Sequence, residues 1–373
     1  MNVRRAVAGG VAGTLTMLIA VAGPAWAGWM NEPIFADVTG DGRIDRVTSV
    51  RVDDMCGISV EAGLAAGGYD RPHVRSYRLP GSTPPYIYCP DMGEAVDMAG
   101  DGTVELVMAW FHGSNTGYDV LVLRGFRPHQ MIDTFMNRPS VIESLDLTAD
   151  GLVDIWQTTD DGHGLLTFLN TRAGTLVPGP LKVDDVTPVV SDMRFVDFDG
   201  NRRLDVLMPY VYGLSGPWSN GVLVGFDNGT VVELVGSLDS EVYWDVSVVD
   251  ADRNGRPDVR TVVATGPTVG TVTTFINRGG RSFVVAPLAN DDLAYAYRAR
   301  PTAIKVRDND WASRNATLSI VTPPRYGRLT TTDPRYEVVY QRTATHRLPD
   351  TFVYRLSQDR RTDTATVTVR MRD

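Results

Sequence analysis

Short apolar runs, separated by acidic loops, fill the chain between residues 30 and 285. The runs EPIFA, GEAVD, VIESL, MRFVD and WDVSVV each precede an acidic nonapeptide, and RVTSVRV, ELVMAWF, VDIWQTT, DVLMPYV and DVRTVVA each follow one. Runs of this length that are rich in Val, Ile and aromatic residues are typical of buried β-strands. The pattern therefore predicts two strands around each of five acidic loops.

A second pattern follows the acidic loops further along several units. The stretches LLTFLNTRAGTLV (165–177), VLVGFDNGTVVEL (222–234) and TVTTFINRGGRSFVV (271–285) each place two β-rich runs around an Asn/Gly turn. Such a turn between β-rich runs predicts a hairpin, and the second unit has a looser version, DVLVLRGFRPHQMI. Each unit thus has four predicted strands in about fifty residues, which is the size of a propeller blade.

The acidic nonapeptides place oxygen-bearing side chains at alternate positions. They read DVTGDGRID (37–45), DMAGDGTVE (97–105), DLTADGLVD (146–154), DFDGNRRLD (197–205) and DADRNGRPD (250–258). Oxygen ligands at positions 1, 3, 5 and 9, with the carbonyl of position 7 and a glycine at position 6, suit a hard cation such as Ca²⁺. The predicted calcium ligands are Asp37, Thr39, Asp41, Arg43 and Asp45 in the first loop, Asp146, Thr148, Asp150, Leu152 and Asp154 in the third, Asp197, Asp199, Asn201, Arg203 and Asp205 in the fourth, and Asp250, Asp252, Asn254, Arg256 and Asp258 in the fifth.

The same nonapeptides are also compatible with polar turns that hold no metal, because Asp, Asn and Gly favour such turns. The second loop fits a metal least, since Ala99 stands at position 3 and Glu105 at position 9. In the fourth loop Arg202 replaces the glycine. The expected role of calcium is structural, because an ion would neutralise the clustered acids.

These units resemble the FG-GAP/VCBS repeats of integrin-α-like β-propellers, whose blades carry D-x-D/N-x-D-G-x-x-D loops. The resemblance covers roughly residues 30–285 and implies an all-β fold with a five-bladed propeller at 28–285. Propellers of this family often have seven blades, so the alternative is an incomplete ring that another chain completes.

Residues 286–373 have a different pattern, ending in the alternating strand TATVTVRM. Several short strands in this length predict a β-sandwich. The stretches ANDD, VTPPRYGRL and DTFVYRLSQDRRTDTATVTV resemble the bacterial cadherin-like/Ig-like domain of large adhesins, which usually serves as a spacer or adhesive module. Asp308 and Asp310 remain of that family's usual acidic motif, whereas its later acids are missing.

Blade topology predicts a ligand face opposite the acidic loops, where the connections between second and third strands gather. Aromatic rings with nearby hydrogen-bonding groups suit a glycan or peptide ligand, although aromatic residues here can equally pack between blades. The predicted ligand-binding residues are Trp110, His112, Tyr118, Trp156, Asp160, Asp161, His163, Tyr210, Tyr212 and Trp218.

Export is predicted by the first 27 residues, which combine Arg4 and Arg5, an apolar core too short to span a membrane, and the cleavage motif AWA. We therefore expect a secreted or periplasmic protein in which Cys56 and Cys89, the only two cysteines, form a disulfide. A net charge of −9 argues against a nucleic-acid partner.

The leading functional hypothesis is a calcium-stabilised binding or adhesion protein for an extracellular glycan or protein. No nucleophile elbow, zincin motif or phosphate-binding loop occurs in the sequence. An alternative is a polysaccharide hydrolase or lyase that uses Glu94, Glu143 and Asp192 in the propeller funnel. A further alternative is a structural spacer in a surface assembly, and the sequence leaves the oligomeric state open.

Overall fold

The computed structural model describes a chain built almost entirely of β-strands. The described residues are 19–21, 32–79, 88–112, 120–132, 139–159, 164–212, 219–298, 300–313, 315–333, 337–345 and 348–372. Within these residues a single short 3₁₀ helix, η1 (Val190–Asp192), is the only helical element. The all-β prediction is confirmed for this part of the chain.

Five antiparallel sheets follow one another along the chain, one for each predicted repeat. The first sheet contains β2 (Ile34–Ala36), β3 (Asp45–Val52), β4 (Met55–Glu61) and β5 (His73–Tyr77), and the second contains β6 (Met92–Val96), β7 (Glu105–Ala109), β8 (Val120–Arg124) and β9 (Arg127–Ile132). The third contains β10 (Pro139–Leu145), β11 (Asp154–Thr159), β12 (Leu165–Asn170) and β13 (Leu176–Pro178). In each sheet, strands that are neighbours in sequence are also hydrogen-bonded neighbours.

The fourth and fifth sheets have the same order. The fourth contains β15 (Arg194–Val196), β16 (Asp205–Val211), β17 (Asn220–Gly225) and β18 (Val231–Ser237), with β14 (Thr187–Pro188) pairing with β16. The fifth contains β19 (Trp244–Val249), β20 (Asp258–Val263), β21 (Val272–Gly279) and β22 (Ser282–Val285). A further strand, β1 (Ile19–Val21), comes from the predicted signal sequence and pairs with β15, while the rest of that sequence lies outside the described residues.

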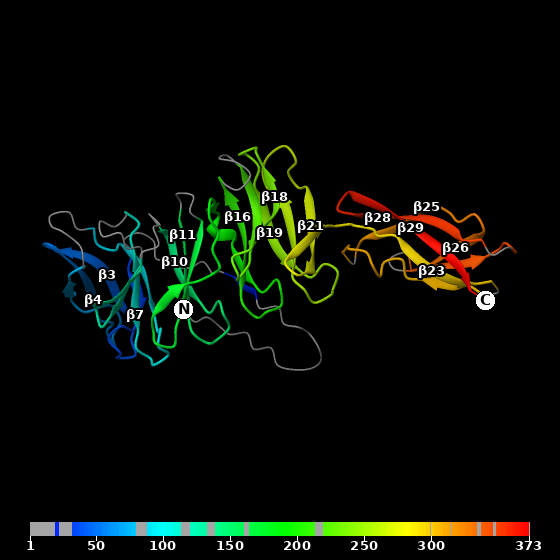
Figure 1. Ribbon diagram of the computed structural model, residues 1–373. Coiled ribbons are helices and arrows are strands. Elements are labelled where there is room, and N and C mark those ends of the chain that lie inside the picture. The colour runs from blue at the N-terminus through cyan, green and yellow to red at the C-terminus, as the bar shows by residue number, and fades with distance from the viewer. Residues whose placement is uncertain are drawn as a thin grey trace.

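Consecutive sheets pack face to face around four apolar clusters. The first and second sheets share a cluster with Ile58 and Leu106, the second and third share one with Val107 and Phe168, and the remaining two clusters join the third to the fourth and the fourth to the fifth sheet. Figure 1 shows the five sheets in a row, from β3 and β4 at one end to β21 beside the carboxy-terminal domain. Among the described residues, no apolar cluster joins the first sheet to the fifth.

The two end sheets carry arginine where inner sheets are apolar. The residue after the last acid of each loop faces the preceding sheet, and it is Leu106, Ile155, Val206 and Val259 in sheets two to five but Arg46 in the first. The residue after that faces the following sheet, and it is Val47, Val107, Trp156 and Leu207 in sheets one to four but Arg260 in the fifth.

Closing the row into a ring would bring these two arginine faces together. Burying an unpaired charge costs several kcal/mol for each ion, and two like charges brought together would also repel one another. Each arginine instead has an acidic partner: the guanidinium of Arg46 lies 2.6 Å from Glu61, and that of Arg260 lies 3.6 Å from Asp359 in the carboxy-terminal domain. The predicted five-bladed ring is therefore not confirmed, and the described residues form an open row.

The carboxy-terminal domain is a sandwich of two sheets. One contains β23 (Asp292–Tyr297), β29 (Arg361–Arg372), β28 (Asp350–Gln358) and β25 (Thr317–Thr322), and the other contains β24 (Thr302–Ile304), β27 (Glu337–Arg342) and β26 (Gly327–Asp333). Strand β23 runs parallel to β29, whereas the other pairs are antiparallel. The alternating burial of β28 and β29 places Phe352, Tyr354 and Val367 in the core between the sheets.

Cys56 on β4 and Cys89 form a disulfide with 5.4 Å between their Cα atoms. The bond links the first sheet to the segment that leads into the second, and Ser49 on β3 donates a hydrogen bond to the carbonyl of Pro90 in the same segment. These links fix the first sheet against its neighbour.

Candidate metal sites

The last acidic residue of each nonapeptide is a buried hydrogen-bond acceptor. Asp258 accepts hydrogen bonds from the backbone N–H groups of Ala251 and Asn277, both at 2.8 Å. Asp205 accepts equivalent bonds from Phe198 and Asp227 at 2.8 Å. Burial raises the pKa of both carboxyl groups to about 7, against the effect of these hydrogen bonds. The acid at position 9 therefore joins its loop to the end of the third strand of the same sheet.

The first acid of each loop closes the turn. Asp37, Asp97, Asp146, Asp197 and Asp250 all accept a hydrogen bond from the N–H of position 6, at 2.7 to 3.1 Å. The side chain at position 5 in turn accepts from the N–H of position 7, as in Asp150 with Leu152 and Asn254 with Arg256. Hydrogen bonds of this kind hold a turn without an ion, so a metal must be argued from the remaining oxygen atoms.

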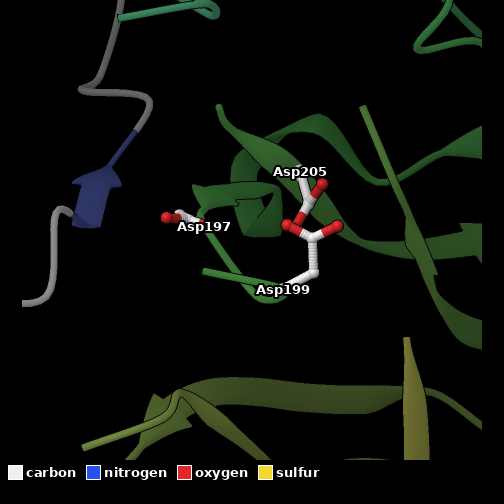
Figure 2. Close-up of side chains that lie close together, drawn as sticks. All are labelled: Asp197, Asp199 and Asp205. Carbon is white, nitrogen blue, oxygen red and sulfur yellow. The ribbon is translucent and has the colours of Figure 1, made fainter. Parts of the chain in front are cut away.

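The fourth loop gathers three carboxylates, which Figure 2 shows around one turn. One ligand oxygen each from Asp197, Asp199 and Asp205 lies within 4.8 Å of the others. Arg281, in the β21–β22 turn of the fifth sheet, donates to Asp199 through Nε and a terminal nitrogen, both at 2.8 Å. Its guanidinium also lies 3.6 Å from Asp227. Arg281 thus offsets part of the negative charge of this loop.

The fifth loop gathers Asp250, Asp252 and Asp258 in the same way. No arginine forms an ion pair with these three acids in the part of the chain that the structure describes. Burial is the main effect that raises the pKa of Asp252, and the negative charge of Asp250 raises it further. The Oδ1 atom of Asp250 is buried and has no hydrogen-bond partner. This oxygen and the uncompensated charge fit a hard cation.

The first three loops also differ in whether an arginine or an unpartnered oxygen lies beside their acids. In the third loop the buried Oγ1 of Thr148, at position 3, has no hydrogen-bond partner, which also fits a cation. In the second loop Arg124 donates to Glu105 at 2.9 Å. In the first loop Arg43 pairs with the exposed Asp41 at 2.6 Å. The residues present therefore fit a metal best in the fifth loop, because the acids of the third loop do not converge as those of the fifth do.

The two interior arginines, Arg124 and Arg281, were not identified from the sequence. Each lies in or beside the turn between the third and fourth strands of its sheet. In a four-stranded antiparallel sheet this turn lies at the same end as the connection between the first and second strands. Topology combined with a basic residue in the turn is the signal that would have placed them near the acidic loops.

Three residues of the predicted ligand face lie in the core. Trp110, Trp156 and Tyr210 are only 2%, 1% and 1% exposed. The Trp110 indole donates to the carbonyl of Tyr88 at 2.9 Å, and the Tyr210 hydroxyl donates to Glu233 at 2.6 Å. These side chains pack between sheets because burying an aromatic ring stabilises more than exposing it. Side chains buried to this extent do not offer a surface to a ligand.

The other predicted ligand residues are exposed or outside the described part. His112 and Tyr212 are exposed; the His112 ring contacts Asp91 and packs edge-on against Phe111. Tyr118, Asp160, Asp161, His163 and Trp218 lie outside the described residues. The structure thus brings none of the ten into one described site.

Two of the three predicted catalytic acids lie close together on first strands of adjacent sheets. Glu94 on β6 accepts a hydrogen bond from Ser144 at 2.6 Å, and its Oε2 is buried without a partner. Burial raises the pKa of Glu94 to about 7, and burial together with the Glu94 charge raises that of Glu143 on β10 to about 7. Asp192 lies apart from this pair, in helix η1.

Comparison with known proteins identifies the last part of the chain. Residues 284–370 match the family described as bacterial Ig domain. The Ig domain begins two residues before the boundary predicted from the sequence. Among the described residues, none forms a helix with the length and apolar character that a membrane span requires.

Matches outside the Ig domain are weak. No curated protein matches the chain. A SusE-like, surface-located polysaccharide-binding protein from the Bacteroides thetaiotaomicron heparin utilisation locus is 10% identical with a TM-score of 0.19; the match covers 65% of this chain and 44% of that one. Domains 1–6 of the surface layer protein SbsC are 12% identical with a TM-score of 0.18, covering 90% of this chain and 50% of that one. Similarity at this level identifies neither fold nor function, and this chain spans half or less of each structure.

Proposed function

We propose that the protein is an exported, calcium-stabilised binding protein whose FG-GAP/VCBS-like sheets form a stiff arm ahead of the Ig domain. Under this proposal it recognises an extracellular glycan or protein ligand. The observation that carries it is the fifth loop, where three carboxylates converge with a buried, unpartnered oxygen on Asp250 and no arginine partner.

In the fifth loop Asp250, Asp252 and Asp258 would hold the ion, and in the third loop Asp146, Thr148 and Asp150 would contribute. A bound Ca²⁺ supplies positive charge that offsets the repulsion among these acids. The acid at position 9 keeps its backbone hydrogen bonds, so the loop remains attached to its sheet. Extracellular modules of this kind need affinities of only about 10⁻⁴–10⁻³ M.

The proposal is tested by titrating the mature chain with calcium and measuring heat and thermal unfolding. We expect binding at more than one site and a melting temperature that falls in chelator. A double variant, Asp250→Asn with Thr148→Val, should lose most of this response. Asp197→Asn in the fourth loop, where Arg281 pairs with Asp199, should keep it. A melting temperature that ignores chelator would refute the metal role, and a glycan array would test ligand recognition separately.

A second candidate function rests on Glu94 and Glu143. Two neighbouring carboxyl groups whose pKa values are both raised to about 7 can share a proton, as a general acid and its partner do in glycoside hydrolysis. Release of reducing ends from a polysaccharide panel, abolished by both Glu94→Gln and Glu143→Gln but not by Asp192→Asn, would support a hydrolase. Absence of product with every polysaccharide would leave the pair a structural one.

A further inference from the structure

A cleft of about 390 Å³ lies between the fifth sheet and the Ig domain. The fifth sheet lines it with Asp250, Arg253, Arg260 and Thr274, and the Ig domain lines it with Ser313, Asn315, Ser357 and Asp359. Ligand sites commonly occur where domains meet and have volumes of about 300–1,000 Å³. The cleft is distinct from the predicted ligand face and from the pair Glu94 and Glu143.

Polar contacts hold the two walls of the cleft together. Asp359, in the turn after β28, accepts a hydrogen bond from Thr274 of β21 at 2.9 Å and from the neighbouring Gln358 at 3.0 Å. The side-chain Oε1 of Gln358 accepts a hydrogen bond from the backbone N–H of Ser313 at 2.7 Å. The bond from Thr274 and the ion pair of Arg260 with Asp359 join the two domains, and the other two bonds hold Asp359 and Gln358 in place within the Ig domain.

One cationic group at the cleft has no partner. Arg253 is exposed, has a φ of 64°, and forms no hydrogen bond or ion pair with the residues the structure describes. Arg260 is the second cation, at 3.6 Å from Asp359. A guanidinium offers a planar pair of donors that matches a carboxylate, so Arg253 offers a partner to an anionic group at this cleft, where Asp359 already pairs with Arg260 and Asp250 adds a negative charge.

The rest of the lining is rich in hydrogen-bonding groups and poor in apolar surface. Asn315 and the hydroxyls of Ser313 and Ser357 come from the Ig domain, while the only apolar side chains in the lining are Val249 and Ala251. A peptide is usually bound through apolar pockets or a free strand edge, which this lining does not provide. A ligand with several hydroxyls and a carboxylate uses the groups that are present.

We propose that this cleft binds a short acidic saccharide, with a uronate carboxylate at Arg253 and sugar hydroxyls at Ser313, Asn315 and Ser357. The inference deepens the proposed extracellular binding function by naming a ligand class and a site. It requires that the chain binds a ligand, and because Asp250 also lines the cleft, the titration is run both with calcium and in chelator.

The test is calorimetric titration of the mature chain with trigalacturonic acid and with its fully methyl-esterified form. We expect the acid to bind and the ester to bind at least about tenfold more weakly, because the ester cannot form the charge-assisted hydrogen bonds that a carboxylate forms with Arg253. Arg253→Ala should weaken binding of the acid by about the same factor. The matched control is Arg202→Ala, since Arg202 is also an exposed arginine at positive φ (73°) in the equivalent loop of the fourth sheet.

Each other outcome decides against the cleft. Equal binding of acid and ester, or binding unchanged in both Arg253→Ala and Asn315→Ala, would overturn the proposal while leaving extracellular binding intact. Preference for hexaglutamate over the saccharide would overturn the ligand class. If only neutral glycans bound on the array, the proposed ligand class would also be rejected. If no ligand bound at all, the proposed function would be rejected as well.

Discussion

The acidic loops of the fourth and fifth sheets share one pattern but are neutralised differently. Both gather three aspartates, and in both the last aspartate is buried and bonded to two backbone N–H groups. In the fourth loop Arg281 reaches Asp199 from the next sheet, whereas the fifth loop has an unpartnered oxygen on Asp250. The fifth is the last sheet of the row, so no sixth sheet supplies an arginine to its loop.

This difference teaches that the acidic loop has two separable parts. The buried acid at position 9 organises the sheet and needs no cation. The acids at positions 1 and 3 create a charge that something else must offset, either a side chain that is always present or an ion that depends on the medium. Under the proposed function, one sequence pattern would serve as a metal site in one repeat, and it forms an ion pair in the next.

The largest expected effect concerns what the two loops have in common. Asp205→Ala and Asp258→Ala should each lower the free energy of unfolding by about 2–5 kcal/mol, because each leaves two buried N–H groups without an acceptor. Urea unfolding with and without calcium measures this, and Asp245→Ala on the exposed face of β19 is the control. A loss that disappeared in chelator would mean that position 9 acts only through a metal.

The next effect separates the loops. At about 10 mM calcium, ion binding should add about 1–3 kcal/mol to the free energy of unfolding over chelator. Asp252→Ala should remove part of this increment, and Asp199→Ala should not. Equal sensitivity of the two variants would show that Arg281 does not replace the ion.

Carboxylates can also be neutralised by protonation, and the pair Glu94 and Glu143 provides a test of this. Both pKa values are raised from 4.5 to about 7 in the folded chain, so the folded state binds more protons than the unfolded state between these values. Stability should then be highest near pH 4.5 and fall as the pH rises to about 7, by about 1–3 kcal/mol. Glu94→Gln should flatten this fall, unlike the exposed control Glu241→Gln, as chemical unfolding at several pH values would reveal.

The smallest expected effect comes from removing the arginine itself. Arg281→Ala should lower the free energy of unfolding in chelator by about 1 kcal/mol, since this guanidinium is partly exposed. The same variant should gain a larger response to calcium, because the fourth loop then resembles the fifth. A variant with no gain, judged against Arg202→Ala, would mean that the fourth loop cannot hold an ion for another reason.

Much of the fold was predictable from local pattern. The apolar runs, the Asn/Gly turns and the spacing of the acidic loops predicted five four-stranded units. The structure contains five such antiparallel units, the fourth of which is extended to six strands by β1 and β14. The carboxy-terminal sandwich was predictable for the same reason, because alternation in TATVTVRM determines which side of β29 is buried. These features depend on residues that are close together in the sequence.

The features that could not be predicted depend on residues that are far apart in the sequence. Arg281 meets Asp199 across 82 residues, so no local motif contains both. Trp156 faces the fourth sheet only because the sheets pack in a particular order. Its polar neighbours in the sequence led to its prediction as a residue of the ligand face. Whether the row closes depends on Arg46 and Arg260, which are recognisable only when all five sheets are aligned.

Arg46 and Arg260 also bear on how such a chain can evolve. Every sheet between them is apolar on both sides. A duplicated inner unit would therefore find compatible neighbours wherever it was inserted, and the arginines of the two end sheets would be unaffected. Relatives could thus differ in reach by whole increments of one unit, with the Ig domain carried further from the amino terminus at each step.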